Sequence, residues 1–358
     1  MRLEKVLKEM QKRQLTHLII NDPSSIDYLI NYKNNPGERM YLLLLSSDGH
    51  HKLFMNNLFY LDHELDIEQV WYSDTDNYLQ LLADEFDGAC SIGIDKNFPA
   101  RFLIPLMNLV DECHFELGSE CVDRVRMIKD EKEQQLMIEA SKINDLVVDE
   151  VINICAKGNL TEEEVSKQLE EIYQKHGCVG NSFEPIVAYG KNGADNHHSG
   201  DDSRLKVGDS IVIDIGGLYK GYCSDMTRTV FYKEVSPKQK TVYELVLKAQ
   251  KAAEAMIKPG VRLCDIDKCA RDIIAEGGYT VEFNHRLGHF IGRDVHEWCD
   301  VSQNFDLEVQ EGMTFSIEPG VYLQGEFGVR IEDLVLVTKD GCKVLNSYPK
   351  DLRVIGND

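Results

Sequence analysis

The chain has 358 residues, of which 43% are hydrophobic and 28% are charged, an ordinary composition for a globular protein. A chain of this length usually forms two domains, because a single hydrophobic core seldom organises so many residues. The formal net charge of -22 argues against nucleic acid or an anionic membrane as a partner. No apolar run is long enough to predict a membrane-spanning segment.

The 10 cysteines are scattered and contain no Cys-x-x-Cys pair. A chain of this size needs no disulfides to stabilise its core, so we expect reduced thiols. The first ten residues are charged and helix-like and lack the apolar centre of a signal peptide. We therefore expect a cytoplasmic protein.

Residues 1–124 alternate short apolar runs with helical patterns, which predicts a small α/β domain with its own sheet. The predicted strands cover residues 16–20, 40–45, 70–72 and 90–94, and the predicted helices cover 26–32, 77–85 and 100–109. The histidines of this part stand alone, and each is expected to be structural.

Residues 125–358 are predicted to form a second domain of the α+β class. It opens with a long amphipathic helix over 129–156, and a second helix follows Thr161, whose spacing to Glu164 is that of a capping box. Strands are then predicted at 183–189, 210–215 and 227–232, helices at 238–257 and 264–276, and strands at 285–291, 313–317 and 330–337. Helices followed by strands, twice over, predict two halves related by a pseudo-twofold axis, with a ligand site between them.

Carboxylates stand in strand-like segments of this second domain. Asp214 follows Ile-Val-Ile, Glu318 follows Phe-Ser-Ile, and Glu332 follows Val-Arg-Ile. Strands that are half-buried seldom carry unpaired carboxylates inward, and burying several anions together is costly unless cations neutralise them. The pattern therefore indicates a compensated charge cluster.

Two further residues complete a candidate ligand set. Asp225 follows Asp214 after a glycine-containing stretch that suits a turn and a returning strand, which would bring the two carboxylates together. His289 stands between Gly288 and Gly292, where the backbone can approach a ligand closely. Four carboxylates and one imidazole are donors that one or two divalent ions accept, so we interpret the chain as a metallohydrolase.

Arg330 is predicted to share a strand face with Glu332, because side chains alternate along a strand with period 2. Taken alone, the pair could be a buried salt bridge. His197, His198, His285 and His296 stand in the same part of the chain as His289, and at least two of the five are expected to act as ligands or in proton transfer. The motifs Gly-x-Gly-x-x-Gly, Gly-x-Ser-x-Gly and His-Glu-x-x-His are absent, so dinucleotide, serine-hydrolase and thermolysin-type sites are not indicated.

At these residues the sequence resembles the pita-bread metallopeptidases, and within them the proline-specific branch of Xaa-Pro dipeptidases (prolidases) and aminopeptidase P. The resemblance covers residues from about 125 to 350, and more loosely the N-terminal domain, which is similar to the creatinase-type domain. The matching segments are Val212-Ile-Asp-Ile-Gly-Gly217, Tyr222-Cys-Ser-Asp-Met-Thr-Arg-Thr229, His285-Arg-Leu-Gly-His289, Asp294-Val-His-Glu297, Phe315-Ser-Ile-Glu-Pro-Gly-Val-Tyr322 and Gly328-Val-Arg-Ile-Glu-Asp333.

The resemblance implies two divalent ions, most often Mn2+ in this branch, with Co2+ or Zn2+ as alternatives. Asp225 and Glu332 would bridge the ions, Asp214 would bind one, and His289 and Glu318 the other. A hydroxide that bridges the ions would attack the Xaa-Pro bond of a peptide with proline in second position, with Glu318 as general base.

Other residues would act on the substrate or on the ligands. His197 and His296 would donate hydrogen bonds to the substrate carbonyl and the oxyanion, with His285 in the same group, and Arg330 would bind substrate or orient the carboxylates. A homodimer is also implied by the resemblance.

The sequence departs from the branch pattern around the site: Asn196 replaces a common proline, and Phe290 replaces the glycine after the ligand histidine. Phe183, Phe290 and Trp298 are candidate walls of a proline pocket, although each could be a core residue. The alternatives are a methionine-aminopeptidase-like enzyme of other specificity, a creatinase-like amidinohydrolase, and a non-catalytic binding protein on the same fold.

Overall fold

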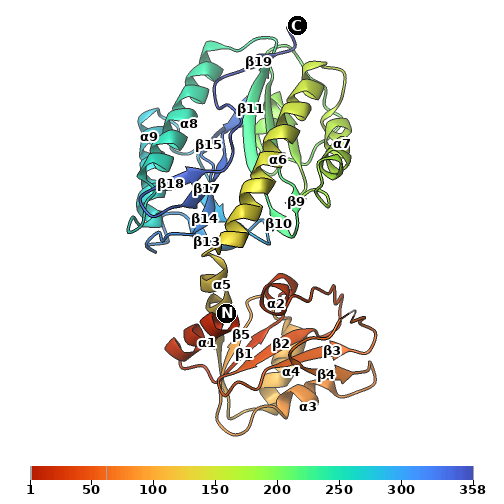
Figure 1. The fold of residues 1–358 in the computed structure, drawn as a ribbon. Helices are drawn as coiled ribbons and strands as arrows, with labels where there is room; N and C mark the ends of the chain where they lie inside the picture. The colour runs from red at the N-terminus through yellow and green to blue at the C-terminus, as the bar shows by residue number, and fades with distance from the viewer. Residues whose placement is uncertain (1, 62, 358) are drawn as a thin grey trace. The chain divides into compact units, whose positions relative to one another are not determined.

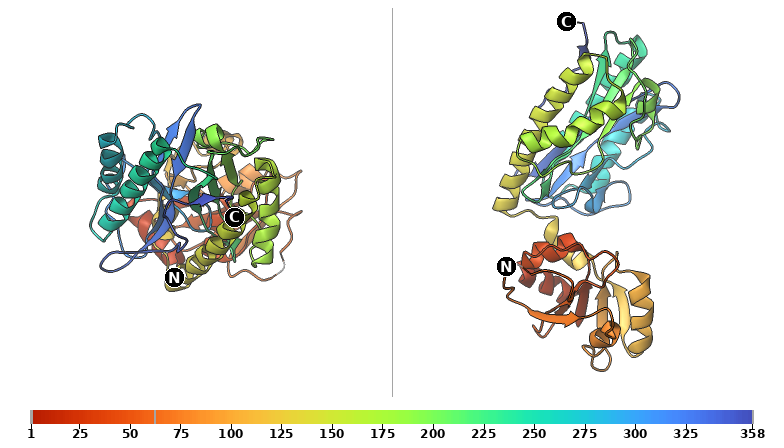
Figure 2. Two further views of the ribbon diagram at one scale, coloured as in Figure 1. Left: turned by 90° about the horizontal axis from the view of Figure 1, so that it is seen from above. Right: turned by 90° about the vertical axis from the view of Figure 1, so that its right-hand side faces the viewer.

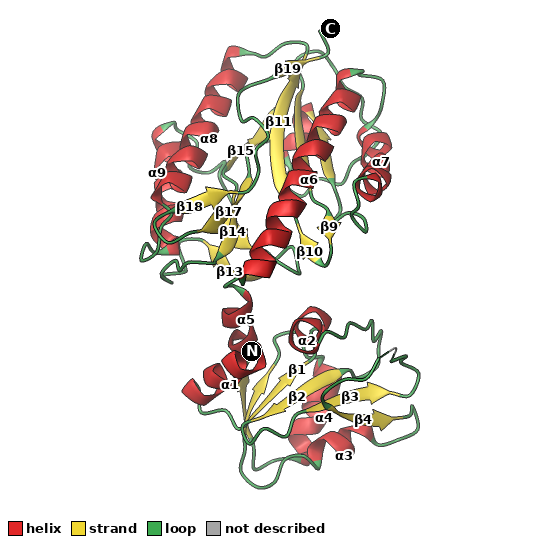
Figure 3. Cartoon of the chain, in the orientation of Figure 1, coloured by secondary structure: helices red, strands yellow, loops and turns green. Residues whose placement is uncertain are grey.

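The computed structural model describes residues 2–61 and 63–357 and divides into two compact units, Met1–Arg126 and Met127–Asp358. Figure 1 follows the chain through both units, and Figure 3 marks their helices and strands. The predicted boundary after residue 124 falls inside α5 (Glu120–Arg126), the last helix of the first unit.

The first unit is a mixed six-stranded sheet in the order β4-β3-β2-β1-β5-β6 with helices on both faces. Its strands are β1 (His17–Ile20), β2 (Leu42–Ser46), β3 (Lys52–Asn56), β4 (Glu68–Tyr72), β5 (Ser91–Ile94) and β6 (His114–Leu117). Its other helices are α1 (Arg2–Lys12), α2 (Pro23–Ile30), α3 (Tyr78–Ala83) and α4 (Ala100–Leu109).

Alternation along the strands explains the two layers of helices. Leu18 and Ile20 of β1 pack in one apolar cluster with α1, α2 and α5, whereas Ile19 packs in a second cluster with α3 and α4. Successive side chains of a strand point to opposite faces, so an unbroken apolar strand such as β1 must be covered on both sides. The predicted α/β character of this part is confirmed.

The second unit has two pairs of helices with strands between them (Figures 1 and 2). One pair is α6 (Glu131–Ala156) and α7 (Glu162–Lys175), and the other is α8 (Pro237–Met256) and α9 (Leu263–Glu276). The predicted capping box is present, because the Thr161 side chain accepts from the Glu164 main-chain N–H and the Glu164 side chain accepts from Thr161 N–H. A short 3-10 helix, η1 (Gly190–Ala194), follows β7.

Each helix pair is followed in the chain by antiparallel strands, which confirms the predicted α+β class. The first half supplies β7 (Ile186–Tyr189), β8 (Ser210–Ile215) and β11 (Met226–Tyr232), which form a sheet with the C-terminal β19 (Val354–Ile355), and the small hairpin β9 (Leu218–Tyr219) and β10 (Tyr222–Cys223). The second half supplies β12 (Gly288–Phe290), β13 (Glu297–Val301), β14 (Thr314–Ile317), β17 (Asp333–Val337) and β18 (Cys342–Val344), and the hairpin β15 (Gly320–Leu323) and β16 (Phe327–Arg330).

The strand predicted over 330–337 is wrong in one respect. The chain leaves β16 at Arg330 and begins β17 only at Asp333, so Glu332 lies between two strands that belong to different sheets. The period-2 argument that placed Arg330 and Glu332 on one strand face therefore does not apply. The Glu332 main-chain N–H donates to the Thr227 carbonyl over 3.1 Å, which joins this break to β11 of the other half.

None of the described helices has the length and hydropathy needed to cross a membrane. None of the 10 cysteines forms a disulfide in the part of the chain that the structure describes.

Candidate metal centre

A cavity of about 640 Å³ in the second unit collects the predicted site residues. Every predicted metal ligand and every histidine predicted to act lines it: His197, Asp214, Asp225, His285, His289, His296, Glu318 and Glu332, together with Arg330. Side chains from both halves of the unit therefore meet at one place.

The first half contributes two aspartates from neighbouring strands. Asp214 lies on β8 and is paired in register with Thr227 of β11, while Asp225 lies immediately before β11. The antiparallel pairing of β8 and β11 brings the two carboxylates together, as the strand–turn–strand spacing predicted.

The second half contributes His289, Glu318 and Glu332. His289 lies on β12, and its Nε2 is 3.4 Å from Glu318 Oε1 and 3.5 Å from Asp225 Oδ2. Ser316 of β14 fixes both neighbours, because its hydroxyl accepts from the His289 main-chain N–H over 3.0 Å and donates to Glu318 over 3.1 Å.

The donor set fits divalent ions. Asp225, His289 and Glu332 offer ligand atoms that all lie within 4.8 Å of one another. One oxygen each of Asp214, Asp225 and Glu332 is buried without a hydrogen-bond partner among the described residues. Buried carboxylate oxygens almost always have a partner, so three orphans on one cavity point to cations as the missing partners.

The pKa values of these groups reflect the same crowding of anions. Burial raises the pKa of Asp225 and of Glu332 well above the ordinary range, and the charge of Asp214 raises the pKa of Asp225 further. Burial also raises the pKa of Glu318 to about 7, although the neighbouring His289 and Arg330 oppose the change. Without cations, the cluster therefore retains protons near neutral pH.

Arg330 is the buried cation of the cluster. Its Nη2 donates to Asp214 over 2.6 Å, its Nε to the Thr227 hydroxyl over 3.0 Å, and its Nη1 to the Tyr322 hydroxyl over 2.9 Å. Thr227 in turn donates to Glu332 over 2.7 Å. The guanidinium therefore fixes carboxylates of both halves, Asp214 directly and Glu332 through Thr227. Arg330 and Glu332 are linked in this way although they do not share the strand that the sequence predicted.

The remaining histidines of the cavity differ in their surroundings. His285 Nε2 lies 3.0 Å from the Tyr322 hydroxyl, and burial, assisted by the charge of Arg330, lowers its pKa to about 3. The His296 ring packs edge-on against His289 with centroids 4.3 Å apart, and burial lowers its pKa to about 4. Both imidazoles are neutral at pH 7, whereas His197 is exposed at the rim of the cavity.

Two of the three predicted pocket walls are not part of the cavity. Phe183 lines it, but Phe290 is fully buried in the apolar core against Phe315, and Trp298 packs on the edge of that core. Phe290 follows His289 on β12, and alternation turns its side chain to the opposite face.

Sequence reasoning missed residues that hold the site by hydrogen bonds or line it. Tyr322 and Thr227 belonged to segments that were noticed, yet only the fold shows that they bond Arg330. Arg286, two residues before β12, also lines the cavity and donates to Asp300 of β13 over 2.6 Å. No spacing in the sequence indicates these contacts.

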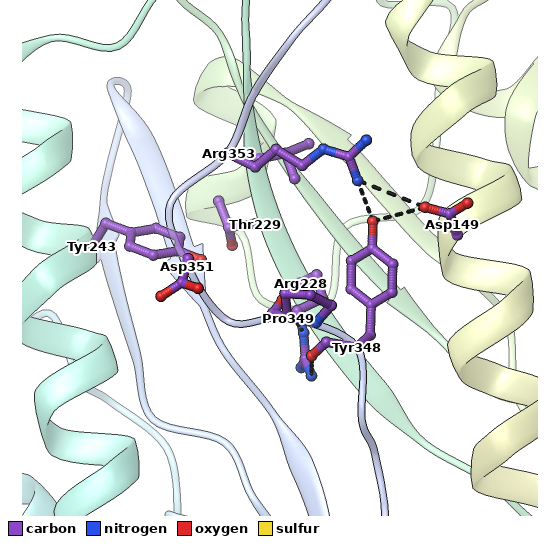
Figure 4. A pocket seen from close by; sticks show the side chains of 9 residues that line it. Asp149, Arg228, Thr229, Tyr243, Tyr348, Pro349, Asp351 and Arg353 are labelled. Atoms are coloured by element: carbon purple, nitrogen blue, oxygen red, sulfur yellow. Dashed lines mark hydrogen bonds and ion pairs between the residues drawn. The ribbon is translucent and has the colours of Figure 1, made fainter.

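A second cavity, of about 410 Å³, is lined by none of the predicted site residues (Figure 4). At its edge the Tyr348 hydroxyl bonds to Arg353 and Asp149. Arg228 also lines this cavity, and its side chain is only 2% exposed. Its guanidinium donates hydrogen bonds to the carbonyl of Glu332 over 2.6 Å and to the carboxylate of Asp333 over 2.7 Å. It thereby ties the break between β16 and β17, which carries the candidate ligand Glu332, to the rest of the unit.

Known proteins share both the family patterns and the fold. The description "Metallopeptidase family M24" matches residues 135–339, and "Creatinase/Prolidase N-terminal domain" matches residues 2–128. A putative dipeptidase of Bacillus subtilis is 45% identical over 67% of this chain and 66% of its own length. An Xaa-Pro dipeptidase of Pyrococcus horikoshii is 34% identical over 98% of both chains. The crystal structure of a prolidase from Thermococcus sibiricus superposes with a TM-score of 0.93 at 32% identity, over 99% of this chain and 98% of that one.

The fold and the cavity thus define a pita-bread hydrolase with a creatinase-type N-terminal domain. The chain belongs to metallopeptidase family M24 and is a peptidase. The relatives that match nearly the whole chain are described as an Xaa-Pro dipeptidase and a prolidase, which favours a peptidase over a creatinase-like amidinohydrolase or a non-catalytic binding protein.

Proposed function

We propose that this peptidase hydrolyses the Xaa-Pro bond at the N-terminus of dipeptides or short peptides, using two divalent ions. The observation that carries the proposal is the set of orphaned carboxylate oxygens of Asp214, Asp225 and Glu332 beside His289. Relatives that match nearly the whole chain are described as an Xaa-Pro dipeptidase and a prolidase, which supports the substrate class.

In this proposal Asp225 and Glu332 would contribute to holding both ions, Asp214 would help to hold one, and His289 and Glu318 would help to hold the other. When bound, divalent ions lower the pKa of water and polarise the scissile carbonyl. We propose Mn2+ as the native ion, with Co2+ or Zn2+ able to replace it, because carboxylate-rich sites discriminate weakly among these ions.

In this proposal, different side chains of the cavity transfer protons and stabilise the charge that develops during the reaction. Glu318 would take the proton of the attacking water and pass it to the proline nitrogen, which becomes the leaving amine. His296 is neutral at pH 7 because its pKa is lowered to about 4, so its ring N–H can donate to the oxyanion without an unpaired charge. His197 and His285 are proposed to bind the substrate carbonyl, and Arg330 orients Asp214 by donating a hydrogen bond to it over 2.6 Å.

Proline as the second residue suits the apolar part of the cavity. The imide nitrogen of an Xaa-Pro bond carries no hydrogen, so recognition depends on the shape of the ring rather than on an N–H contact. Phe183, Ile186 and Val295 line the cavity and can pack against such a ring.

The test is hydrolysis of Ala-Pro and of Ala-Pro-Ala by metal-stripped protein, with and without added Mn2+. We expect cleavage only with the metal. Preference for the dipeptide would define a prolidase, and preference for the tripeptide an aminopeptidase P. No cleavage of either peptide by protein with bound metal would refute the proposed substrate class. We further propose a cytoplasmic homodimer. Cysteines that form no disulfide among the described residues suit a reducing compartment. Gel filtration with light scattering tests the dimer.

A further inference from the structure

His197 belongs to a loop that must be held in place from outside the cavity. Its side chain is exposed, and among the described residues its ring makes no hydrogen bond. Only its main-chain N–H is held, by Asp195 Oδ1 over 3.1 Å. The position of the imidazole therefore depends on how the following residues of the loop are anchored.

The anchor is Glu162, the first residue of α7, which is completely buried. Its Oε2 lies 2.7 Å from His198 Nε2 and accepts the Asp201 main-chain N–H over 3.1 Å. Its Oε1 accepts the Tyr189 main-chain N–H over 2.6 Å and the Asn192 amide over 3.0 Å. One carboxylate thus holds the end of β7, the 3-10 helix η1 and both sides of the His197 loop.

The loop also lies against the start of α7 through its backbone. The main-chain N–H groups of Glu162 and Glu163 donate to the carbonyls of Ser203 and Asp201 over 3.3 and 3.1 Å. A side chain at Gly200 would come within 3.3 Å of the Glu162 backbone, so glycine allows this close approach. Backbone contacts and the Glu162 carboxylate therefore both hold the loop against the start of α7.

Glu162, His198 and Asp201 also have the composition of a metal site. Each Glu162 oxygen already accepts two hydrogen bonds, from the partners named above. Neither oxygen therefore needs a cation to satisfy it. This group differs in that respect from the cluster of Asp214, Asp225 and Glu332.

We propose that Glu162, through His198, is a positioning residue that holds the loop of residues 195–201 so that His197 reaches the substrate. The proposal rests on the function proposed above, in which His197 binds the substrate carbonyl. Glu162 itself touches neither the substrate nor an ion, so its substitution acts only through the loop.

A double-mutant cycle on Mn2+-loaded full-length protein tests this role, with Ala-Pro hydrolysis as the readout. The variants are E162Q, H197A and the double variant. In E162Q an amide NH2 replaces one acceptor and faces main-chain donors, so the loop loses an anchor. We expect kcat to fall at least tenfold in E162Q with bound metal unchanged. In the H197A background the same change should alter kcat less than twofold, because the group it positions is gone.

Substitutions at His198 test the same anchor with less risk to folding, because this side chain is 13% exposed. H198Q retains an N–H that can donate to Glu162 and should stay within threefold of wild type. H198F has a ring of similar size without a donor and should lose at least tenfold in kcat.

The matched control is D95N in the first unit. Asp95 is also buried and accepts the main-chain N–H groups of Asn21 and Asp22 over 3.1 and 3.0 Å. D95N should lower thermal stability but leave kcat within twofold of wild type.

The proposed function and the positioning role fail in different ways. A wild-type protein with bound metal that cleaves neither Ala-Pro nor Ala-Pro-Ala refutes the proposed function. An active wild type whose E162Q and H197A effects multiply, or whose E162Q variant keeps full kcat, refutes the positioning role.

Discussion

Replacing Arg228 by methionine should destabilise the second unit far more than replacing the other arginine of the same cavity. Arg228 is almost fully buried and donates five hydrogen bonds: to the carbonyls of Thr227, Glu332, Tyr348 and Pro349, and to the carboxylate of Asp333. Methionine fills a similar volume but donates none of these. Removing one partner of a buried ion pair costs about 3–5 kcal/mol.

The structure places the expected cost at the lower end of that range. Asp333 keeps two other donors, because Lys350 Nζ is 2.6 Å away and Gln250 donates to it over 3.1 Å. The anion is therefore not left alone, and the loss comes mainly from the uncompensated carbonyls. We expect the free energy of unfolding of R228M to be about 3 kcal/mol lower than that of wild type, which corresponds to a fall in Tm of roughly 6–12 °C in a domain of this size.

The control is R353M. Arg353 lines the same cavity, but its side chain is 44% exposed and its partner Asp149 is 52% exposed (Figure 4). Exposed ion pairs contribute less than about 1 kcal/mol to stability, so the free energy of unfolding of R353M should be close to that of wild type. Urea unfolding of metal-free protein, followed by near-UV circular dichroism, measures both variants. If the free energies of unfolding of R228M and R353M differ by less than 1 kcal/mol, the reasoning about the buried network is wrong.

Three further predictions concern the metal centre and its surroundings. D214N should lower kcat on Ala-Pro at least about 100-fold with a loss of bound metal, measured by steady-state kinetics and atomic absorption. In metal-free protein the raised pKa of Glu318, about 7 against an ordinary 4.5, stabilises the fold below pH 4.5 and ceases to do so as pH rises to 7. The unfolding free energy of wild type relative to E318Q should therefore fall by about 3 kcal/mol over that window, and a flat difference in urea titrations would contradict the assignment. F290A should lower the free energy of unfolding by about 3–5 kcal/mol and leave KM for Ala-Pro little changed. F183A should instead raise KM, with a smaller loss of stability. The reverse pattern would show that Phe290 is a pocket wall.

Local patterns were enough to predict most elements of the fold. The apolar run that ends at Asp214 and the capping-box spacing of Thr161 depend on neighbours in the sequence, so both could be predicted from the sequence alone. The break at Glu332 could not, because Val-Arg-Ile-Glu-Asp-Leu-Val-Leu-Val has the composition of one continuous strand. What divides it is the bond between Glu332 N–H and the Thr227 carbonyl, a contact between distant segments.

The site shows the same division. Candidate ligands could be chosen because a carboxylate in an apolar strand is conspicuous, whatever its partners. The residues that fix those ligands are ordinary in sequence: Ser316, Thr227 and Tyr322 acquire their roles from what the fold places beside them. The same holds for Glu162, which reads only as an acidic residue in the first turn of a helix.

The cavity draws Asp214 and Asp225 from one half of the second unit, and His289, Glu318 and Glu332 from the other. An ion held by side chains of both halves would bind only the state in which the two halves are packed together. Such a ligand stabilises the native state by a free energy that grows with the logarithm of the free ligand concentration. The lifetime of this protein against cellular proteases should therefore depend on the supply of divalent metal. When metal is scarce, degradation would remove the peptidase that can no longer work.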